Sequence, residues 1–341
     1  MDTQVIEVRL WGKRVGAVAP DLRLGCYVFA YEPAWRRSGI ELAPLTMPLD
    51  DARQSFAFPE LAELGYKRLP GLLADALPDD FGNALIDAWM AARGVEKSAI
   101  TTLDFDAAPG FEHWLLKFDG VGKDAELGGS ADYGRIEYAY HLMAKAAGIR
   151  MSACRLLEES GRAHFMTRRF DRDVADGQTI KHHIQTLCAM SHLDYKQRAT
   201  HAYAQLFMAI AQLKLGDEAI GQAFRRMAFN VMARNCDDHT KNFAFRLKQG
   251  GTWELAPAYD VTHAYNPKGE WTYQHLLGVN GKFAGITRAD LLAEADRFGV
   301  RRPLDALADV RAALEQWTNF GIEAGLGQQT IDDIRANFEP L

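Results

Sequence analysis

The sequence predicts an α+β protein in two parts, a small N-terminal α+β unit and a larger core that becomes mostly helical. Three patterns support this prediction. Apolar and polar residues alternate near the N-terminus, a strand, a helix and two strands follow one another between residues 114 and 167, and helical periodicity dominates from about residue 184. We therefore assign residues 1–100 to the N-terminal unit and 101–341 to the core, whose two lobes span about 111–170 and 171–341.

The N-terminal unit begins with a predicted β-hairpin. Apolar residues alternate through 5–17 around a turn at Gly12, and a further strand is expected over 26–31. Prolines then interrupt the chain repeatedly, which indicates a compact irregular region. A helix is expected to start at 78–80 and to end near Gly94.

The core begins with a short strand at 114–118 that carries one lysine, Lys117, among apolar neighbours. Apolar residues at helical spacing over 136–147 then predict an amphipathic helix that Gly148 closes, with Glu137 beside the apolar stripe. Two strands complete an order that is typical of the small lobe of a kinase. The remaining expected elements are the strands 154–157 and 164–167, the helices 202–215, 219–235 and 288–298 with Thr287 as N-cap, and two helices after Pro303.

Composition narrows the possible classes of function. The chain has 341 residues, 48% hydrophobic and 25% charged, which is ordinary for a soluble globular protein. A net charge of -6 argues against a wide nucleic-acid footprint, so any DNA contact is expected to be indirect. Four distant cysteines without a CxxC pair favour a reducing cytoplasm. Charged residues interrupt the apolar stretch at the N-terminus, and no long apolar run follows. We therefore expect a protein that is neither exported nor membrane-spanning.

The segment 235–242, NCDDHTKN, carries the richest chemistry. It places Asn242 five residues after Asp237, between a long apolar helix and a strand. A phosphotransferase needs an aspartate that accepts the proton of the attacking hydroxyl and an asparagine whose oxygen holds magnesium. This spacing lets one loop supply both groups, although an isolated Asp-x-x-x-x-Asn can also simply cap helices and turns.

A hairpin downstream brings a second aspartate to the same place. If its turn is centred near residue 250, Asn242 lies opposite residue 258, and Asp260 follows two residues later. Diagonal neighbours on paired strands are about 7–8 Å apart, so Asn242 and Asp260 could share one magnesium ion. Lys117 would complete the site by contacting phosphates, with Glu137 as its ion-pair partner. The alternative is that Lys117 snorkels at a strand edge.

Three other patterns have plainer interpretations. The cluster 237–239 could suggest a metal hydrolase, but no second group of ligands has matching spacing. His182 and His183 resemble a metal pair, yet adjacent strand residues point to opposite faces, so we interpret them as ordinary polar positions. The charged run 168–172 is typical of a solvated surface, and its place after the last small-lobe strand makes it a candidate hinge.

The chain resembles the HipA family of toxin kinases through almost its whole length. The resemblance rests on the hairpin at 9–16 and on four motifs in family order: LPGLLADALPDDF at 69–81, RFDR at 169–172, DDHTKN at 237–242 and APAYDV at 256–261. It implies an ATP- and magnesium-dependent serine/threonine-protein kinase with a bilobal kinase-like core on which the N-terminal unit packs.

The resemblance also implies partners and roles for individual residues. Family members phosphorylate proteins, with aminoacyl-tRNA synthetases the known target class, and are neutralised by a DNA-binding antitoxin of the HipB type. The implied roles are Asp237 as catalytic base, Asn242 and Asp260 as magnesium ligands, Lys117 as phosphate ligand, Arg168, Arg169 and Phe170 as the adenine-side hinge, and His239 and Tyr259 as walls of the nucleotide pocket.

The chain departs from the family ahead of the lysine strand. Family members carry a Gly-rich loop there with a serine that can be autophosphorylated, whereas here 98–101 runs almost directly into 104–110. Because such a loop gives backbone N–H donors to the nucleotide, its loss should weaken ATP binding. A true deletion and a segment missing from the printed chain are both open, and an intact mass near 38.0 kDa would exclude the second.

Two rival functions remain open. One is a small-molecule kinase of the aminoglycoside type, against which the N-terminal unit argues. The other is a kinase-like subunit that has lost activity and serves in an antitoxin and operator complex. Four retained positions argue against complete loss: Lys117, Asp237, Asn242 and Asp260.

Overall fold

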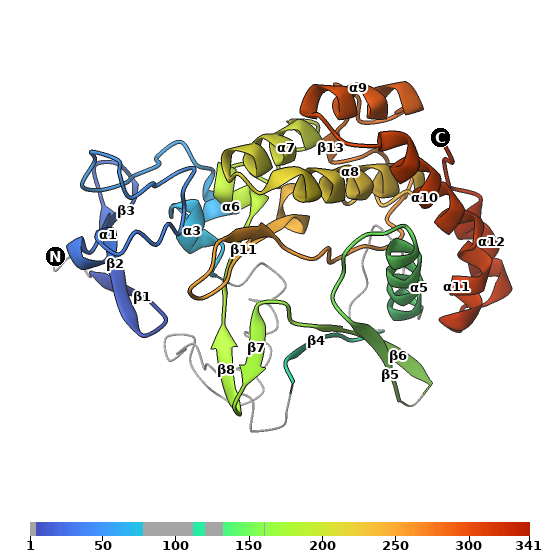
Figure 1. Cartoon of the computed structure of the whole chain (residues 1–341), viewed down its shortest axis with the longest axis horizontal. Coiled ribbons are helices and arrows are strands. Elements are labelled where there is room, and N and C mark those ends of the chain that lie inside the picture. The colour runs from blue at the N-terminus through green and yellow to red at the C-terminus, as the bar shows by residue number, and fades with distance from the viewer. Residues whose placement is uncertain (1–4, 78–111, 120–131, 160) are drawn as a thin grey trace. The chain divides into compact units, whose positions relative to one another are not determined.

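The computed structural model of the chain describes residues 5–77, 112–119, 132–159 and 161–341. The chain divides into two compact units, one made of residues up to 112 together with 173–181, the other of 113–172 and 182–341. The expected helix from residue 78, the expected unit boundary near residue 100 and the segment 98–110 lie outside the described residues. Figure 1 shows the elements coloured by their position along the chain.

The first unit contains the predicted hairpin and the strand after it. Strands β1 (Ile6–Leu10), β2 (Lys13–Asp21) and β3 (Cys26–Tyr31) form an antiparallel sheet in that order. Trp11 and Gly12 both have positive φ, as a two-residue hairpin turn requires. Buried aromatic side chains such as Phe29 form the core of the unit. Its short helices are α1 (Pro33–Arg36), α2 (Glu63–Tyr66) and α3 (Gly71–Ala74).

A hairpin from the middle of the chain also belongs to this first unit. Strands β7 (Arg172–Ala175) and β8 (Gln178–Lys181) pair with one another. The indole N–H of Trp11 donates to the backbone carbonyl of Lys181 at 2.7 Å. This contact is one reason why 173–181 groups with the N-terminal residues, whereas the sequence assigned it to the core.

The second unit opens with the predicted order of strand, helix, strand and strand. Strand β4 (Trp114–Lys117) pairs antiparallel with β6 (Arg162–Arg168), which pairs with β5 (Cys154–Glu159). Helix α5 (Tyr133–Ala146) packs on this sheet. A Cβ on Gly134 would lie 2.2 Å from the backbone oxygen of Ala163, so the missing side chain is what allows this close approach.

The rest of the second unit is mainly helical. Figure 1 shows α7 and α8 side by side, and residues 226–233 in and after α8 are buried without interruption. Thr287 caps α9 as predicted, within a capping box that includes Asp290. The helices are α6 (Leu187–Ser191), α7 (Tyr203–Gln212), α8 (Gly216–Met232), α9 (Arg288–Phe298), α10 (Pro303–Glu315), α11 (Trp317–Glu323) and α12 (Gln328–Arg335).

The expectation of two helices after Pro303 was wrong, because the structure has three there. Only Gln316 separates α10 from α11, so no breaker residue marks that boundary in the sequence. Gly325, with a φ of +77°, then turns the chain before α12.

Two small sheets lie among these helices. Strands β11 (Ala244–Leu247) and β12 (Trp253–Leu255) form the predicted hairpin, and β9 (His183–Thr186) pairs with the other side of β11. Arg246 lies opposite Glu254, which confirms a hairpin centred on residue 250. The short strands β10 (His201–Ala202) and β13 (Leu277–Gly278) pair in parallel.

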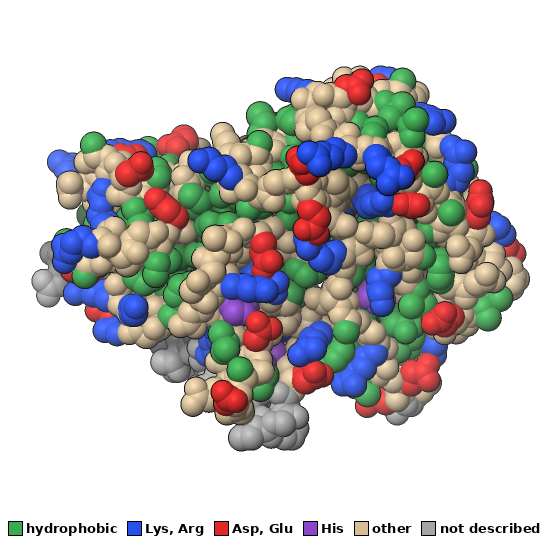
Figure 2. All heavy atoms as spheres, in the orientation of Figure 1, with side chains coloured by type: hydrophobic (Ala, Val, Ile, Leu, Met, Phe, Trp, Pro, Cys, Tyr) green, Lys and Arg blue, Asp and Glu red, His purple; other side chains and the backbone are tan. Residues whose placement is uncertain are grey.

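The visible surface carries charges of both signs without a large field of one sign, as Figure 2 shows for one face. Across the part of the chain that the structure describes, no helix is long and apolar enough to cross a membrane.

Candidate active site

The loop after α8 is closed by hydrogen bonds that fix the spacing of its polar residues. The amide N–H of Asn235 donates to the carbonyl of Asn230 at 2.9 Å, which ends the helix. The side-chain amide of Asn242 then donates to the backbone carbonyl of Asp237 at 2.7 Å. Thr240 donates from its hydroxyl to the carbonyl of Leu193 at 2.8 Å. The segment from Asp237 to Asn242 is therefore a loop closed by a hydrogen bond between its two ends.

Lys117 lies among carboxylates. Its ammonium group is 2.8 Å from Glu137 Oε1 on α5, which confirms the expected ion pair, and it also bonds to Asp260 Oδ1. Burial lowers the pKa of Lys117, but Asp260 and Glu137 together raise it above its usual value. The lysine therefore stays charged. Its side chain is half exposed but forms ion pairs with Glu137 and Asp260, so it does not simply extend into solvent at a strand edge.

Asp260 follows the hairpin in a backbone conformation that few side chains adopt. Its φ is +55°, in the left-handed region, which Asp and Asn tolerate better than most residues. Lys117 lowers the pKa of Asp260, and a hydrogen bond from the Asn242 side chain acts in the same direction. Asn242 and Asp260 thus meet, as the hairpin register predicted.

These side chains suit a magnesium ion by the chemistry of their donors. A carboxylate and an amide oxygen are hard ligands, and magnesium in nucleotide sites usually takes one or two carboxylates, with phosphates and water in the remaining positions. Within the described ranges, no three His, Cys, Asp or Glu side chains are grouped to hold a metal by themselves. The donor set of Asn242 and Asp260 therefore fits a metal that arrives with a nucleotide.

The two adjacent aspartates of the loop face different surroundings. Asp237 keeps 44% of its side chain exposed, and its Oδ1 lies 3.9 Å from Nε2 of His239. Burial lowers the pKa of His239, so this ring is neutral near pH 7. An exposed carboxylate beside a neutral imidazole can accept a proton from an incoming hydroxyl.

Asp238 instead points into the core, where it is fully buried. Its Oδ2 accepts hydrogen bonds from the Tyr203 hydroxyl at 2.7 Å and from His275 Nδ1 at 3.0 Å. Its Oδ1 accepts from the amide of Leu276 at 2.8 Å. Burial lowers the pKa of His275, but the Asp238 carboxylate outweighs burial and raises it to about 10. The pair is thus a buried ion pair that anchors the loop.

The residues of the predicted hinge divide into two groups. Arg168 and Arg169 use their backbone amides within the lobe, donating to the carbonyls of Ala153 at 2.8 Å and His113 at 2.9 Å. Phe170 instead faces the aromatic ring of Tyr259, with ring centroids 5.6 Å apart. Phe170 is thus the hinge residue for which a contact with another predicted pocket residue is established.

Two residues that sequence reasoning missed belong beside this site. Leu115 lies two residues before Lys117 on β4, so its side chain is on the same face of the strand, and it is 52% exposed. Strand alternation could have identified it. Asp238 was considered only as part of a possible hydrolase cluster, and nothing local in the sequence signals that it turns inward.

His182 and His183 lie in ordinary structural surroundings. His182 Nδ1 accepts a hydrogen bond from the amide of Gln249 at 3.2 Å, and the His183 ring packs against Trp253.

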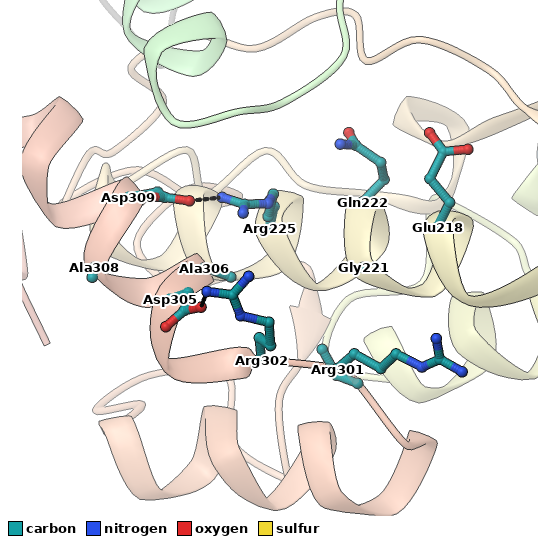
Figure 3. Close-up of a pocket in the computed structure, with 11 residues that line it drawn as sticks. Glu218, Gly221, Gln222, Arg225, Arg301, Arg302, Asp305, Ala306, Ala308 and Asp309 are labelled. Atoms are coloured by element: carbon teal, nitrogen blue, oxygen red, sulfur yellow. Dashed lines mark hydrogen bonds and ion pairs between the residues drawn. The ribbon is translucent and has the colours of Figure 1, made fainter.

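A cavity of about 530 Å³ lies elsewhere, between α8 and the start of α10 (Figure 3). None of the predicted site residues lines it. Figure 3 shows Arg225 directed at Asp309, at 2.7 Å, and Arg302 directed at Asp305. The candidate active site remains the one around Asp237, because the lining of this cavity includes none of its residues.

Two protein-family models match the chain. Residues 6–105 match the family model of the HipA N-terminal domain, and residues 90–318 match that of the HipA-like C-terminal domain. A search of curated protein sequences found no match.

Two solved structures are similar to the chain. HipA of Shewanella oneidensis, in a complex with HipB and operator DNA, aligns with a TM-score of 0.60 and 18% identity over 97% of this chain and 95% of that one. The Helicobacter pylori proinflammatory kinase CtkA aligns with a TM-score of 0.41 and 11% identity over 68% of this chain and 90% of that one.

Proposed function

Because the chain belongs to the HipA family, we propose that it is a toxin of that family which acts as an ATP- and magnesium-dependent serine/threonine-protein kinase. One observation carries this proposal. Lys117, Glu137, Asn242 and Asp260 come from four separate segments and converge on one point, beside the loop that exposes Asp237.

The proposed reaction assigns one role to each group. Asp237 accepts the proton of a Ser or Thr hydroxyl as its oxygen attacks the γ-phosphorus, and the bond to the bridging oxygen of ADP breaks. Lys117 holds the α- and β-phosphates, and Glu137 orients it. Asn242 and Asp260 would hold magnesium, which when bound neutralises charge on the phosphate oxygens. The products are ADP, a phosphoprotein and a proton.

The proposed nucleotide pocket uses the aromatic pair and the exposed leucine. Phe170 and Tyr259 would support the adenine ring of ATP on one side, and Leu115 would cover the ring from the strand that carries Lys117. His239 would complete the wall next to Asp237. Arg168 and Arg169 remain proposed hinge residues that shape the backbone there.

Partners are proposed from the relatives. The Shewanella HipA structure contains HipB and operator DNA, so we propose a DNA-binding antitoxin of the HipB type, with DNA contacted only through it. The acceptor is proposed to be a protein, with an aminoacyl-tRNA synthetase one candidate. The four cysteines are free, which supports a cytoplasmic location.

The proposal is tested by calorimetric titration with ATP and magnesium. Wild type and Asp237→Asn should bind the nucleotide, whereas Asp260→Ala should lose magnesium-dependent binding. Asp237→Asn should also lose phosphate transfer, because the amide matches the carboxylate in volume but cannot accept the proton. Wild type that does not bind millimolar ATP would favour an inactive subunit, and transfer at the normal rate by Asp237→Asn would overturn its role as base.

A further inference from the structure

We propose that Arg226 is a positioning residue for the proposed magnesium ligands, Asn242 and Asp260, and that it acts through one water molecule in a cavity beside them. This inference rests on the proposed kinase function and deepens it, because it assigns a role to a buried cation that the nucleotide chemistry above does not use. The cavity measures about 10 Å³, and its lining includes Arg226, Asn235 and both proposed ligands. We call it the small cavity.

The guanidinium group of Arg226 is buried with part of its hydrogen-bonding capacity unused. The residue, on α8, is 3% exposed, and its Nη2 donates to the carbonyl of Ala256 at 2.7 Å. Among the described residues, Nε and Nη1 have no hydrogen-bond partner. Burial lowers the pKa of Arg226 to about 9, and no carboxylate of the described segments is among the groups that raise it. The group is therefore still charged at pH 7, and a buried charge is costly unless its donors are hydrogen-bonded.

A buried carboxylate fixes which way the neighbouring side-chain amides point. Asp238 accepts the proton of the Tyr203 hydroxyl, so the hydroxyl oxygen accepts from Nδ2 of Asn230, at 2.9 Å. That leaves Oδ1 of Asn230 to accept from Nδ2 of Asn235, at 3.0 Å. Oδ1 of the buried Asn235 is thus an acceptor, and within the described parts of the chain nothing donates to it. Residues with unpaired donors and an unpaired acceptor therefore line the same small cavity.

Water suits both unpaired groups, whereas a small anion does not. A water oxygen can accept from Nε or Nη1 of Arg226 while the same molecule donates a proton to Oδ1 of Asn235. A chloride ion can only accept, so it would face the lone pairs of Oδ1 without forming a bond. The volume agrees, because a space of about 10 Å³ holds about one water molecule and is too small for the larger chloride ion. The small cavity is therefore a site for one water molecule.

The water joins the two segments that supply the proposed magnesium ligands. Asn235 begins the loop that ends at Asn242. The guanidinium group of Arg226 also holds the carbonyl of Ala256, four residues before Asp260. Arg226 therefore holds one segment directly and the other through the water, which keeps Asn242 and Asp260 close enough to bind one metal. Substitution of such outer groups typically lowers metal affinity by about 10- to 100-fold.

The test measures ATP binding to the full chain by calorimetry, with and without magnesium. Arg226→Met keeps the apolar stem of the side chain and removes its donors, so ATP affinity should fall about tenfold with magnesium and less than about twofold without it. Arg226→Lys keeps a charge and a donor, and its affinity should stay within about threefold of wild type. Arg225→Met is the matched control, because Arg225 precedes Arg226 on α8 but pairs with Asp309 at 2.7 Å. It should bind ATP and magnesium as wild type does.

A crystal structure of wild type is the second measurement. One density peak should lie within hydrogen-bond distance of Arg226 and of Oδ1 of Asn235, and a bromide soak should give no anomalous peak there. A small cavity with no peak, or one that holds bromide, would overturn the inference even if Arg226→Met does not fold. So would an Arg226→Met variant whose ATP affinity is unchanged or falls equally with and without magnesium. Wild type that binds ATP with no effect of magnesium would instead contradict the proposed function, and this inference with it.

Discussion

Replacing Asp238 with asparagine would test whether a buried ion pair anchors the loop that carries Asp237. The substitution keeps the size of the side chain and removes its charge. Oδ1 of the new amide can still accept from the amide of Leu276, and the Tyr203 hydroxyl oxygen, which already accepts from Asn230, has a second lone pair for the new NH₂ group. The main loss is therefore the attraction between Asp238 and the imidazolium of His275.

The pKa of His275 sets the size of this loss. It is raised to about 10 from an ordinary value of 6.5, so the folded protein binds the proton more tightly than the unfolded chain. The resulting stability is fully present below pH 6.5 and is lost as the pH rises through 10. It amounts to about 4 kcal/mol at pH 7 and about 1 kcal/mol at pH 9.

The assay is urea unfolding of wild type and Asp238→Asn, followed by tryptophan fluorescence at pH 7 and pH 9. The difference in free energy of unfolding between the two proteins should shrink by about 2–3 kcal/mol from pH 7 to pH 9. Other groups titrate alike in both proteins, so they cancel in this difference. A difference that does not change between the two pH values would refute the ion pair, and His275→Gln should reproduce the same pH dependence.

Three further substitutions test individual contacts. Gly134→Ala should destabilise the protein by about 1–3 kcal/mol in urea, because the added methyl would meet the carbonyl of Ala163, and a smaller effect would mean that α5 shifts freely. Glu137→Gln should weaken ATP binding about tenfold in calorimetry by releasing Lys117 from one carboxylate, and unchanged binding would argue against an orienting role. Leu115→Ala should weaken ATP binding by a similar factor without loss of stability, since the side chain is half exposed, and normal affinity would remove it from the pocket.

Features that depend on local geometry could be predicted from the sequence. The register of the hairpin follows from the position of its turn, so Asn242 and Asp260 could be brought together without a structure. The pairing of Lys117 with Glu137 follows from the order of strand and helix in a small lobe. Period 2 and period 3.6 fix the direction of side chains on such elements.

Features that depend on irregular backbone could not be predicted. Asp238 and His275 lie 37 residues apart and neither is within a regular element, so no periodicity indicates that they face each other. The contact of Tyr195 with His239 joins two loops in the same way. The inclusion of 173–181 in the first unit is supported by a contact between residues 170 positions apart, the hydrogen bond from Trp11 to Lys181, which no local pattern indicates.

The dipeptide at 237–238 shows why these unpredictable contacts matter for the chemistry. The proposed base, Asp237, must be reachable by its substrate, and 44% of its side chain is exposed, but an exposed loop is usually mobile. Its neighbour Asp238 points the other way and binds groups from two parts of the second unit, Tyr203 on α7 and the adjacent residues His275 and Leu276. Hydrogen bonds and the adjacent His275 offset the cost of burying the Asp238 carboxylate, and the carboxylate in turn raises the pKa of His275. The accessibility of one aspartate thus depends on the burial of the next, and loss of the His275 charge should loosen the loop that carries Asp237 before the fold itself fails.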